Sequence, residues 1–414
     1  MSNTFLLGRQ PILDREEKVF AYGLVFRSAE SPRQTTDNGT FPTADLIIEL
    51  LSEVAAQGVL GQFQGAVNIG PELLMDDLMA TLPAKRFILV LDRNPPATDE
   101  MIDRCRRLKE SGFTLALGDH PFRPEYAEIY QSFDIIGINV KHTPADLIQA
   151  SIQQFRRHPV RLLAEHVETR DEFAAYLSQG FELFQGLFFT KPTVNARKKL
   201  TEIAATLLRL VLLIINDSGV EAIVRTVQES PSVTYKLLLQ ANSVVVGARQ
   251  EINSVRHAIM LLGRDRIRRW ALFELLVANG GSQERNNPLF TMAMARSVFM
   301  EYLSESHPLL GGGSDAVDRA CLVSVLSMME TIYNVSIEDV VKEVVLAADL
   351  KMALLQRAGL LGDMLSFVEA LERLDFATAG KMLPKLQLSP ARILEAQRRS
   401  LLKNSGGASN DLMI

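Results

Sequence analysis

Apolar residues in the first half of the chain follow two alternating patterns. Short, mostly apolar runs rich in β-branched residues are each followed by a longer stretch whose apolar positions recur every three or four residues. The short runs are expected strands, at residues 21–27, 65–70, 86–92, 114–119, 134–140, 161–167 and 183–189. The longer stretches are expected helices, several with capping residues at their ends, at residues 43–58, 98–112, 143–158 and 169–180.

Repeated strand–helix units with nearly continuous apolar strands imply a parallel sheet. Seven or eight such strands favour a closed (β/α) barrel, and the lack of a glycine-rich phosphate loop after the first strand argues against a dinucleotide-binding fold. Barrel enzymes carry their chemistry at the carboxyl ends of the strands. The polar residues at those ends are Arg27, Asn68, Asp92, Asp119, Asn139, Glu165 and Gln185. They predict a site at the barrel mouth, unless they are polar only because strand ends face solvent.

The second half has helical periodicity without strand alternation. The expected helices span residues 205–219, 230–243, 253–263, 264–280, 288–303, 315–333 and 337–355. The predicted fold class is therefore α/β plus all-α. We expect a barrel domain at 1–195, a helical domain at 196–400 and a disordered tail at 401–414.

Composition narrows the class of protein. The 414 residues are 47% hydrophobic and 22% charged, which excludes disordered and fibrous chains. The net charge of −5 argues against a nucleic-acid binder. Cys105 and Cys321 are too far apart for a disulfide framework or a thiolate metal cluster. No signal peptide is evident, and the most apolar run, 210–215, is far shorter than the roughly 20 residues of a membrane span. We therefore expect a soluble, cytoplasmic protein without a membrane anchor.

Several strings in the first half, among them RQPILD, AYGLVFR, LALGDH, LLAEHVET and FQGLFFTKP, resemble the EAL domain, whose members hydrolyse the bacterial messenger cyclic di-GMP. The resemblance covers residues 5–195. It implies an EAL-type (β/α) barrel. It also implies two-metal phosphodiester hydrolysis, in which carboxylate and amide oxygens hold two divalent cations and a lysine helps to place the attacking water.

The chain departs from the EAL pattern at the residues that carry this chemistry. The name-giving glutamate, the metal-bridging aspartate and the lysine fall at Gly23, Gly118 and Gly137, and a further glutamate falls at Leu89 or Val90, with Asp92 nearby. The remnants at the mouth are Gln10, Arg27, Asn68, Asp119, Glu165 and Gln185. Because glycine and aliphatic residues supply no ligand oxygen, we expect no metal, no cofactor and no catalytic residue. The remnants are expected to bond to loop backbone. The alternative is residual nucleotide contact through Arg27 and Gln10, so that cyclic di-GMP binds weakly or not at all.

The strings SPSVTYKLLLQANS and INSVRHAIMLLG resemble the HDOD domain, a relative of the HD phosphohydrolases. This resemblance covers residues 197–395 and implies an HDOD-type helical bundle. The HD enzymes hold their metal with a His-Asp pair, which this chain lacks. Only two of its histidines, His257 and His307, lie in the helical half. Too few imidazoles are present for a metal centre.

A basic cluster in the helical half adjoins the only tryptophan. It consists of Arg264, Arg266, Arg268, Arg269 and Trp270. Three interpretations remain open: a solvated helix face, a surface for an acidic protein partner, or, less favoured, a nucleic-acid contact. Because arginine and tryptophan are enriched among interface hot spots, the cluster is the candidate partner surface.

Together the two resemblances imply an EAL–HDOD signalling protein of the bacterial cytoplasm. We expect it to be a pseudoenzyme that acts through protein–protein interaction in or beside cyclic di-GMP pathways, with motility or biofilm control implied by the family. Two alternatives stay open: a sensor that binds cyclic di-GMP without hydrolysis, and a weak residual phosphodiesterase. Homodimer formation is also left open.

Overall fold

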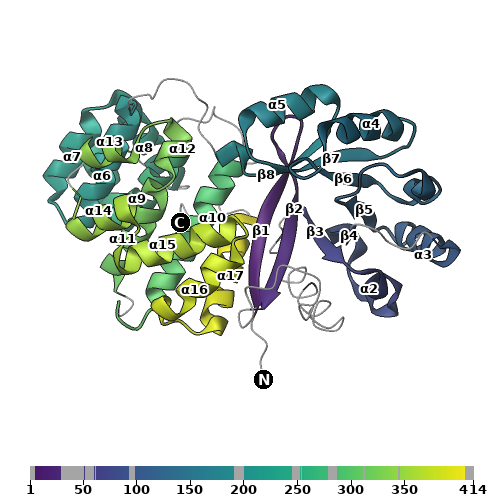
Figure 1. Ribbon diagram of the computed structural model, residues 1–414. Coiled ribbons are helices and arrows are strands. Elements are labelled where there is room, and N and C mark those ends of the chain that lie inside the picture. The colour runs from purple at the N-terminus through teal and green to yellow at the C-terminus, as the bar shows by residue number, and fades with distance from the viewer. Residues whose placement is uncertain are drawn as a thin grey trace.

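Eight strands close into a barrel in the computed structural model, and a helical domain lies beside them (Figure 1). The structure describes residues 5–28, 51, 60, 62–92, 98–190, 200–244, 252, 254–277, 287–310, 313–343 and 346–405. The predicted fold class, an α/β barrel followed by an all-α domain, is confirmed.

All seven predicted strands are present, and an eighth precedes them. The strands are β1 (Phe5–Asp14), β2 (Val19–Ser28), β3 (Gln64–Ile69), β4 (Phe87–Asp92), β5 (Thr114–Gly118), β6 (Ile135–Asn139), β7 (Arg161–Val167) and β8 (Leu183–Gly186). The last strand ends three residues earlier than predicted. The added strand, β1, is antiparallel to both of its neighbours, β2 and β8, whereas the other neighbouring pairs are parallel.

The described helices of the barrel domain follow its strands. They are α2 (Pro71–Met75), α3 (Asp99–Glu110), α4 (Ala145–Phe155) and α5 (Arg170–Gln179), with short 3-10 turns η1 (Asp77–Thr81), η2 (Ala84–Arg86), η3 (Pro124–Tyr126), η4 (Ile129–Ser132) and η5 (Phe188–Thr190). A capping box between Thr169 and Glu172 starts α5, and Gly180, at φ 108°, ends it. The helix predicted at 43–58 lies outside the described residues, apart from Leu51.

The barrel has two apolar layers. Inward-facing side chains from all eight strands fill its interior, namely Ile12, Ala21, Ala66, Ile88, Ala116, Ile135, Leu163 and Leu183. The residues that alternate with them along the strands pack outward against the surrounding helices and loops. This interior packing makes the barrel a solid core, so that ligands can reach only its rim.

The second half consists of helices in the described residues. They are α6 (Glu202–Ile215), α7 (Val220–Gln228), α8 (Pro231–Val244), α9 (Val255–Val277), α10 (Pro288–Ser306), α11 (Ser314–Leu326), α12 (Met329–Tyr333), α13 (Ile337–Glu343), α14 (Ala348–Gln356), α15 (Gly359–Glu372), α16 (Phe376–Leu386) and α17 (Pro390–Ser405). The predicted boundary within α9 corresponds to a break at Gly263, whose φ of 75° is not helical. Helix α17 enters the predicted tail, and residues 406–414 lie outside the described part. No described helix is long and apolar enough to cross a membrane.

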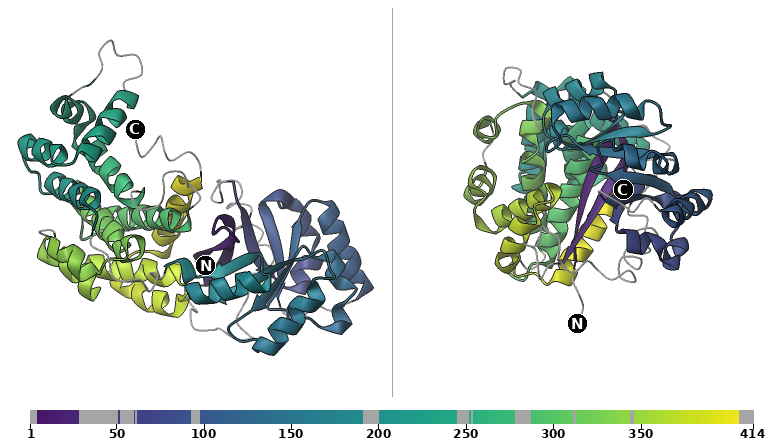
Figure 2. Two further views of the ribbon diagram at one scale, coloured as in Figure 1. Left: turned by 90° about the horizontal axis from the view of Figure 1, so that it is seen from above. Right: turned by 45° about the vertical axis from the view of Figure 1, so that its right-hand side comes forward.

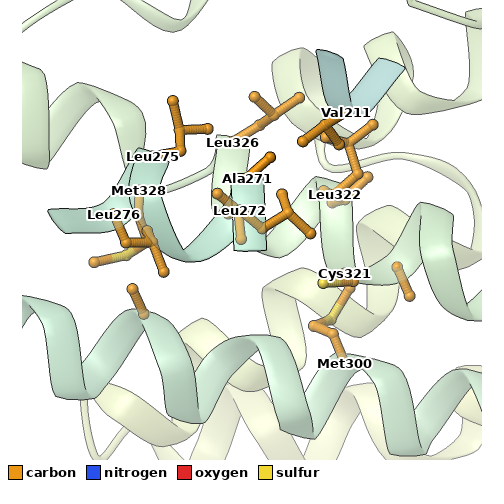
Figure 3. Packing of buried hydrophobic residues seen from close by; sticks show 14 of the residues in the cluster. Val211, Ala271, Leu272, Leu275, Leu276, Met300, Cys321, Leu322, Leu326 and Met328 are labelled. Atoms are coloured by element: carbon orange, nitrogen blue, oxygen red, sulfur yellow. The ribbon is translucent and has the colours of Figure 1, made fainter. Parts of the chain in front are cut away.

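One large core holds the helical domain together. Apolar side chains of α6, α9, α10 and α11 meet around Leu272, Met300, Cys321 and Leu322 (Figure 3). Leu6 of β1 also belongs to this core, although it lies in the first strand of the barrel. The apolar core of the helical domain therefore extends to the barrel domain.

The β1–β2 hairpin joins the two domains. Its strands pair with each other along most of their length, but β1 pairs with β8 only over Ile12–Asp14. The free part of the hairpin is covered by α15 and α17, as Figures 1 and 2 show. A Cβ on Gly8 would lie 2.4 Å from Cδ2 of Leu374, so glycine permits this close approach. Gln397 of α17 accepts a hydrogen bond from the N–H of Leu7 and donates one to its carbonyl.

Candidate functional site

The mouth of the barrel brings several predicted site residues onto one rim. Glu165 of β7 is in register with Gln185 of β8, which is in register with Ile12 two residues beyond Gln10. Asn68 of β3 is exposed. Arg27 lies in β2, and its side chain is outside the described residues. The side chain of Asp92 is also outside them.

Glu165 fills space that missing side chains would need. Its Oε2 accepts a hydrogen bond of 3.2 Å from the backbone N–H of Asp119. A Cβ on Gly137, where the EAL lysine would stand, would lie 2.1 Å from Oε1 of Glu165. A Cβ on Gly118 would lie 3.6 Å from the same oxygen. Because position 137 carries no side chain, the carboxylate of Glu165 can lie next to the backbone of β6.

Gln185 takes up the corresponding space beside β2. A Cβ on Gly23, where the name-giving glutamate would stand, would lie 2.9 Å from Nε2 of Gln185. That nitrogen donates a hydrogen bond of 3.1 Å to Oε1 of Gln10, which is 8% exposed. The two amides thus satisfy part of each other's hydrogen-bonding capacity, and both are held at the rim.

The residues present at this rim do not fit a pair of divalent cations. Such a site needs several carboxylate or amide oxygens turned toward a common point. In the described part of the chain, no group of three or more His, Cys, Asp or Glu side chains could hold a metal ion. Gly23, Gly118 and Gly137 supply no oxygen, and Oε2 of Glu165 is bonded to an N–H group. The described side chains at the mouth can therefore offer a ligand hydrogen bonds.

Other polar residues near the mouth stabilise its loops. Asn139, at the end of β6, accepts hydrogen bonds from the backbone N–H groups of Lys141 and His142, at 3.2 and 3.3 Å. His120 is fully buried, and its Nε2 lies 3.0 Å from the hydroxyl of Tyr130. In the sequence His120 stands out only as the last residue of the string LALGDH. Its contact with Tyr130, ten residues away, could not be predicted from the spacing of apolar residues along the chain.

The basic cluster of α9 is only partly on the surface. Trp270 is 3% exposed and belongs to the helical core, and Arg268 is 8% exposed and forms an ion pair of 2.7 Å with Asp318 of α11. Burial raises the pKa of Asp318, and Arg268 opposes that rise. Arg264 donates to Asp217 at 2.6 Å. Because α9 packs against α6 and α11, part of the cluster faces the interior, and Arg268 and Trp270 are corrected from partner surface to structural roles.

Arg264, Arg266 and Arg269 are the partly exposed members of the cluster. Nε of Arg269 lies 3.4 Å from the carbonyl of Asp265, one turn earlier in α9. Arg264, Arg266 and Arg269 remain the part of the predicted partner surface that solvent can reach.

Comparison with known proteins identifies the second half. The family model for the HDOD domain matches residues 199–356. These residues form an HDOD domain. The predicted order, a closed barrel followed by an HDOD domain, is confirmed, with the barrel strands in residues 5–186 and the HDOD match after them.

Two curated relatives extend over both domains. The protein YuxH of Bacillus subtilis (strain 168) is 26% identical over 385 residues, which are 91% of this chain and 92% of the relative. Cyclic di-GMP phosphodiesterase CdgJ of Vibrio cholerae is 27% identical over 384 residues, 90% of this chain and 86% of the relative. Both are therefore similar to this chain through most of its length.

Solved structures similar to this chain cover slightly less than half of it. A standalone EAL protein from Vibrio cholerae O395, in its cyclic di-GMP-bound form, is 20% identical with a TM-score of 0.36, and covers 46% of this chain and 93% of that protein. The EAL enzyme Bd1971, in a form with cAMP and cyclic di-GMP bound, is 14% identical with a TM-score of 0.37, and covers 46% of this chain and 62% of that one.

Proposed function

We propose that this chain is a bacterial cytoplasmic signalling protein that works in or beside cyclic di-GMP pathways without hydrolysing the nucleotide. The similarity to CdgJ, a protein named as a cyclic di-GMP phosphodiesterase, supports the pathway. The observation that carries the non-enzymatic part is the position of Glu165. Its carboxylate lies where the EAL lysine would stand, beside Gly137, and bonds to backbone.

The chemistry of the reaction explains why this position matters. Phosphodiester hydrolysis needs an activated water and neutralisation of the phosphate charge, and metals supply both in a two-metal site. At this rim, three of the positions that would hold or orient those groups are glycine. The remaining amides, Gln10 and Gln185, bond to each other. A pair of neutral amides can neither lower the pKa of a water molecule nor neutralise the negative charge of a phosphodiester.

An activity assay tests this proposal directly. Purified full-length protein, incubated with cyclic di-GMP and magnesium or manganese, should give no linear dinucleotide above a control without protein. Metal-dependent turnover that is lost in Glu165→Ala but kept in Glu182→Ala would refute the proposal. Glu182 is the matched control because it is a glutamate at the opposite end of the β7–β8 pair, where it forms an ion pair with Arg161. Gly23→Glu alone should also remain inactive, because Gly118 still supplies no bridging carboxylate.

The alternative to this proposal is a sensor that binds cyclic di-GMP without hydrolysing it. A charge-assisted hydrogen bond contributes about 1.5–3 kcal/mol, whereas micromolar affinity needs roughly 8 kcal/mol. Without metals, Arg27 and Gln10 would have to supply most of that energy. Calorimetry should therefore give no dissociation constant below a few micromolar. Tighter binding that is lost in Arg27→Ala would favour the sensor function instead.

For the output of the protein, we propose that the HDOD domain carries the surface for a protein partner and that the barrel positions it. A folded domain without its own chemistry acts most simply by presenting a surface. Arg266 and Arg269 are the candidate charged residues on that surface because both are partly exposed, whereas Arg268 and Trp270 are buried. Capture of the same partners by residues 1–195 alone would contradict this assignment.

A further inference from the structure

A cavity of about 90 Å³ lies between the two domains. The barrel contributes side chains from β1, β2 and the turn after β8, and the helical domain contributes α10, α15 and α17. Cavities at domain interfaces are common ligand sites because two surfaces can enclose a small molecule. This cavity is separate from the barrel mouth, and nothing in the proposed function requires it.

The helical wall of the cavity contains a charge network that is already balanced. Arg296, 5% exposed, donates from Nε to Oε1 of Glu372 at 2.9 Å and from Nη1 to the hydroxyl of Ser327 at 2.7 Å. Glu369 lies 3.6 Å from Arg296 and also pairs with Arg357 at 2.9 Å. Two guanidinium groups therefore face two carboxylates, and this wall contributes no net charge to the cavity.

Arg9 of β1 is an additional cation on the opposite wall. Its guanidinium carbon lies 4.0 Å from the centre of the Tyr22 ring, and both residues line the cavity. Within the described part of the chain, no carboxylate forms an ion pair with Arg9. Burial lowers the pKa of this guanidinium, yet arginine stays charged in proteins. The cavity thus contains one positive charge that the described residues leave uncompensated by an anion.

Most of the other side chains that line the cavity are apolar. They come from both domains and include Leu7, Met292, Phe299, Val368 and Leu371. An inorganic phosphate would have to place polar oxygens against these groups, and a dianion would leave excess negative charge. A carboxylate at one end of a short hydrocarbon chain matches one cation and an apolar lining.

We propose that this interdomain cavity binds a short aliphatic monocarboxylate, with its carboxylate on Arg9 and its hydrocarbon chain between Leu7, Met292 and Val368. The volume sets the size of the ligand. A 150 Å³ cavity accepts benzene, which has about six non-hydrogen atoms, so by proportion a cavity of 90 Å³ suits a molecule of roughly four such atoms. Side chains that line the cavity must move apart to admit about five or six. Propionate and butyrate fall in this range.

The test uses the full-length protein with methyl-labelled methionine. Sodium propionate and sodium butyrate should each shift the Met292 methyl signal to saturation, while the signal of Met79, buried in the barrel domain away from the cavity, should stay in place. Propionamide, which has the same shape without charge, should give no shift at the same concentration. Sodium chloride at equal ionic strength is the blank.

Two variants locate the site. Arg9→Gln should weaken propionate binding at least tenfold, whereas Arg161→Gln should not change it. Arg161 is the matched control because it also lies over an aromatic ring of the barrel, Phe20, at 4.6 Å, but does not line the cavity. Ala295→Leu fills the cavity from α10 without removing charge, and it should also abolish binding. It tests the proposal even if Arg9→Gln fails to fold.

Four outcomes would overturn the proposal. These are the absence of a saturable shift with either carboxylate, an equal shift with propionamide, an unchanged dissociation constant in folded Arg9→Gln or Ala295→Leu, and displacement of propionate by inorganic phosphate at equal concentration. None of these results depends on the barrel mouth, so the proposal can fail while the proposed function stands.

Discussion

Replacing Gln397 by leucine should weaken the attachment of the helical domain to the barrel. Gln397 is 4% exposed, and its side-chain amide makes two hydrogen bonds to the backbone of Leu7, one from N–H to Oε1 at 3.2 Å and one from Nε2 to the carbonyl. Leu7 lies in the part of β1 that extends beyond β8, where a strand edge has no neighbour. The amide of Gln397 therefore takes the place of a missing strand.

The size of the effect follows from the two backbone groups that the substitution leaves unpaired. An unsatisfied buried donor or acceptor costs about 1–3 kcal/mol. Leu7 is itself buried, so water cannot replace both bonds without opening the interface. Loss of both bonds should therefore cost about 2–6 kcal/mol. Because each 1.4 kcal/mol is a tenfold change, the open form of this interface should become at least about 30-fold more populated.

Hydrogen exchange of the peptide that contains β1 measures this opening directly. In Gln397→Leu, the Leu7 amide should exchange at least about 30-fold faster, and the urea midpoint reported by Trp270 fluorescence should fall. Gln179→Leu is the matched control, because Oε1 of Gln179 is buried without a hydrogen-bond partner and its removal breaks no bond. Unchanged exchange in β1 together with an unchanged midpoint would refute the reasoning.

Two further predictions concern the cysteines and the arginines of α9. Burial raises the pKa of the Cys105 thiol to about 11 and that of Cys321 well above its ordinary value of 9.0. At pH 8 the Cys105 thiolate should be roughly 100-fold scarcer than that of an ordinary thiol, and the Cys321 thiolate should also be scarce. A disulfide reagent should therefore label both only after denaturation; rapid labelling of the native protein would contradict this. Charge reversal of Arg266 and Arg269 to glutamate should weaken partner capture at least tenfold without lowering the melting temperature. An unchanged set of captured proteins would show that these arginines only face solvent.

The sequence alone determined the elements and their order. Strand and helix periodicities are local, so the seven predicted strands and the break at Gly263 needed no knowledge of distant contacts. Strand β1 was missed among the candidates because it has no preceding helix, and its antiparallel pairing is a long-range feature. The loss of side-chain oxygens at Gly23, Gly118 and Gly137 was also readable from the sequence, since glycine has none in any fold.

Only the tertiary structure decided what replaces those missing groups and which charges face solvent. The sequence alone does not indicate that the side chain of Glu165 occupies the space beside Gly137, because the two residues are neighbours only through the pairing of β6 and β7. In the same way, the position of α11 puts Asp318 beside Arg268 and leaves Arg269 partly exposed one residue later. The uncompensated charge of Arg9 appears only when the helical domain covers the β1–β2 hairpin. Contacts between distant segments set burial, and burial determines whether a charged side chain needs a partner.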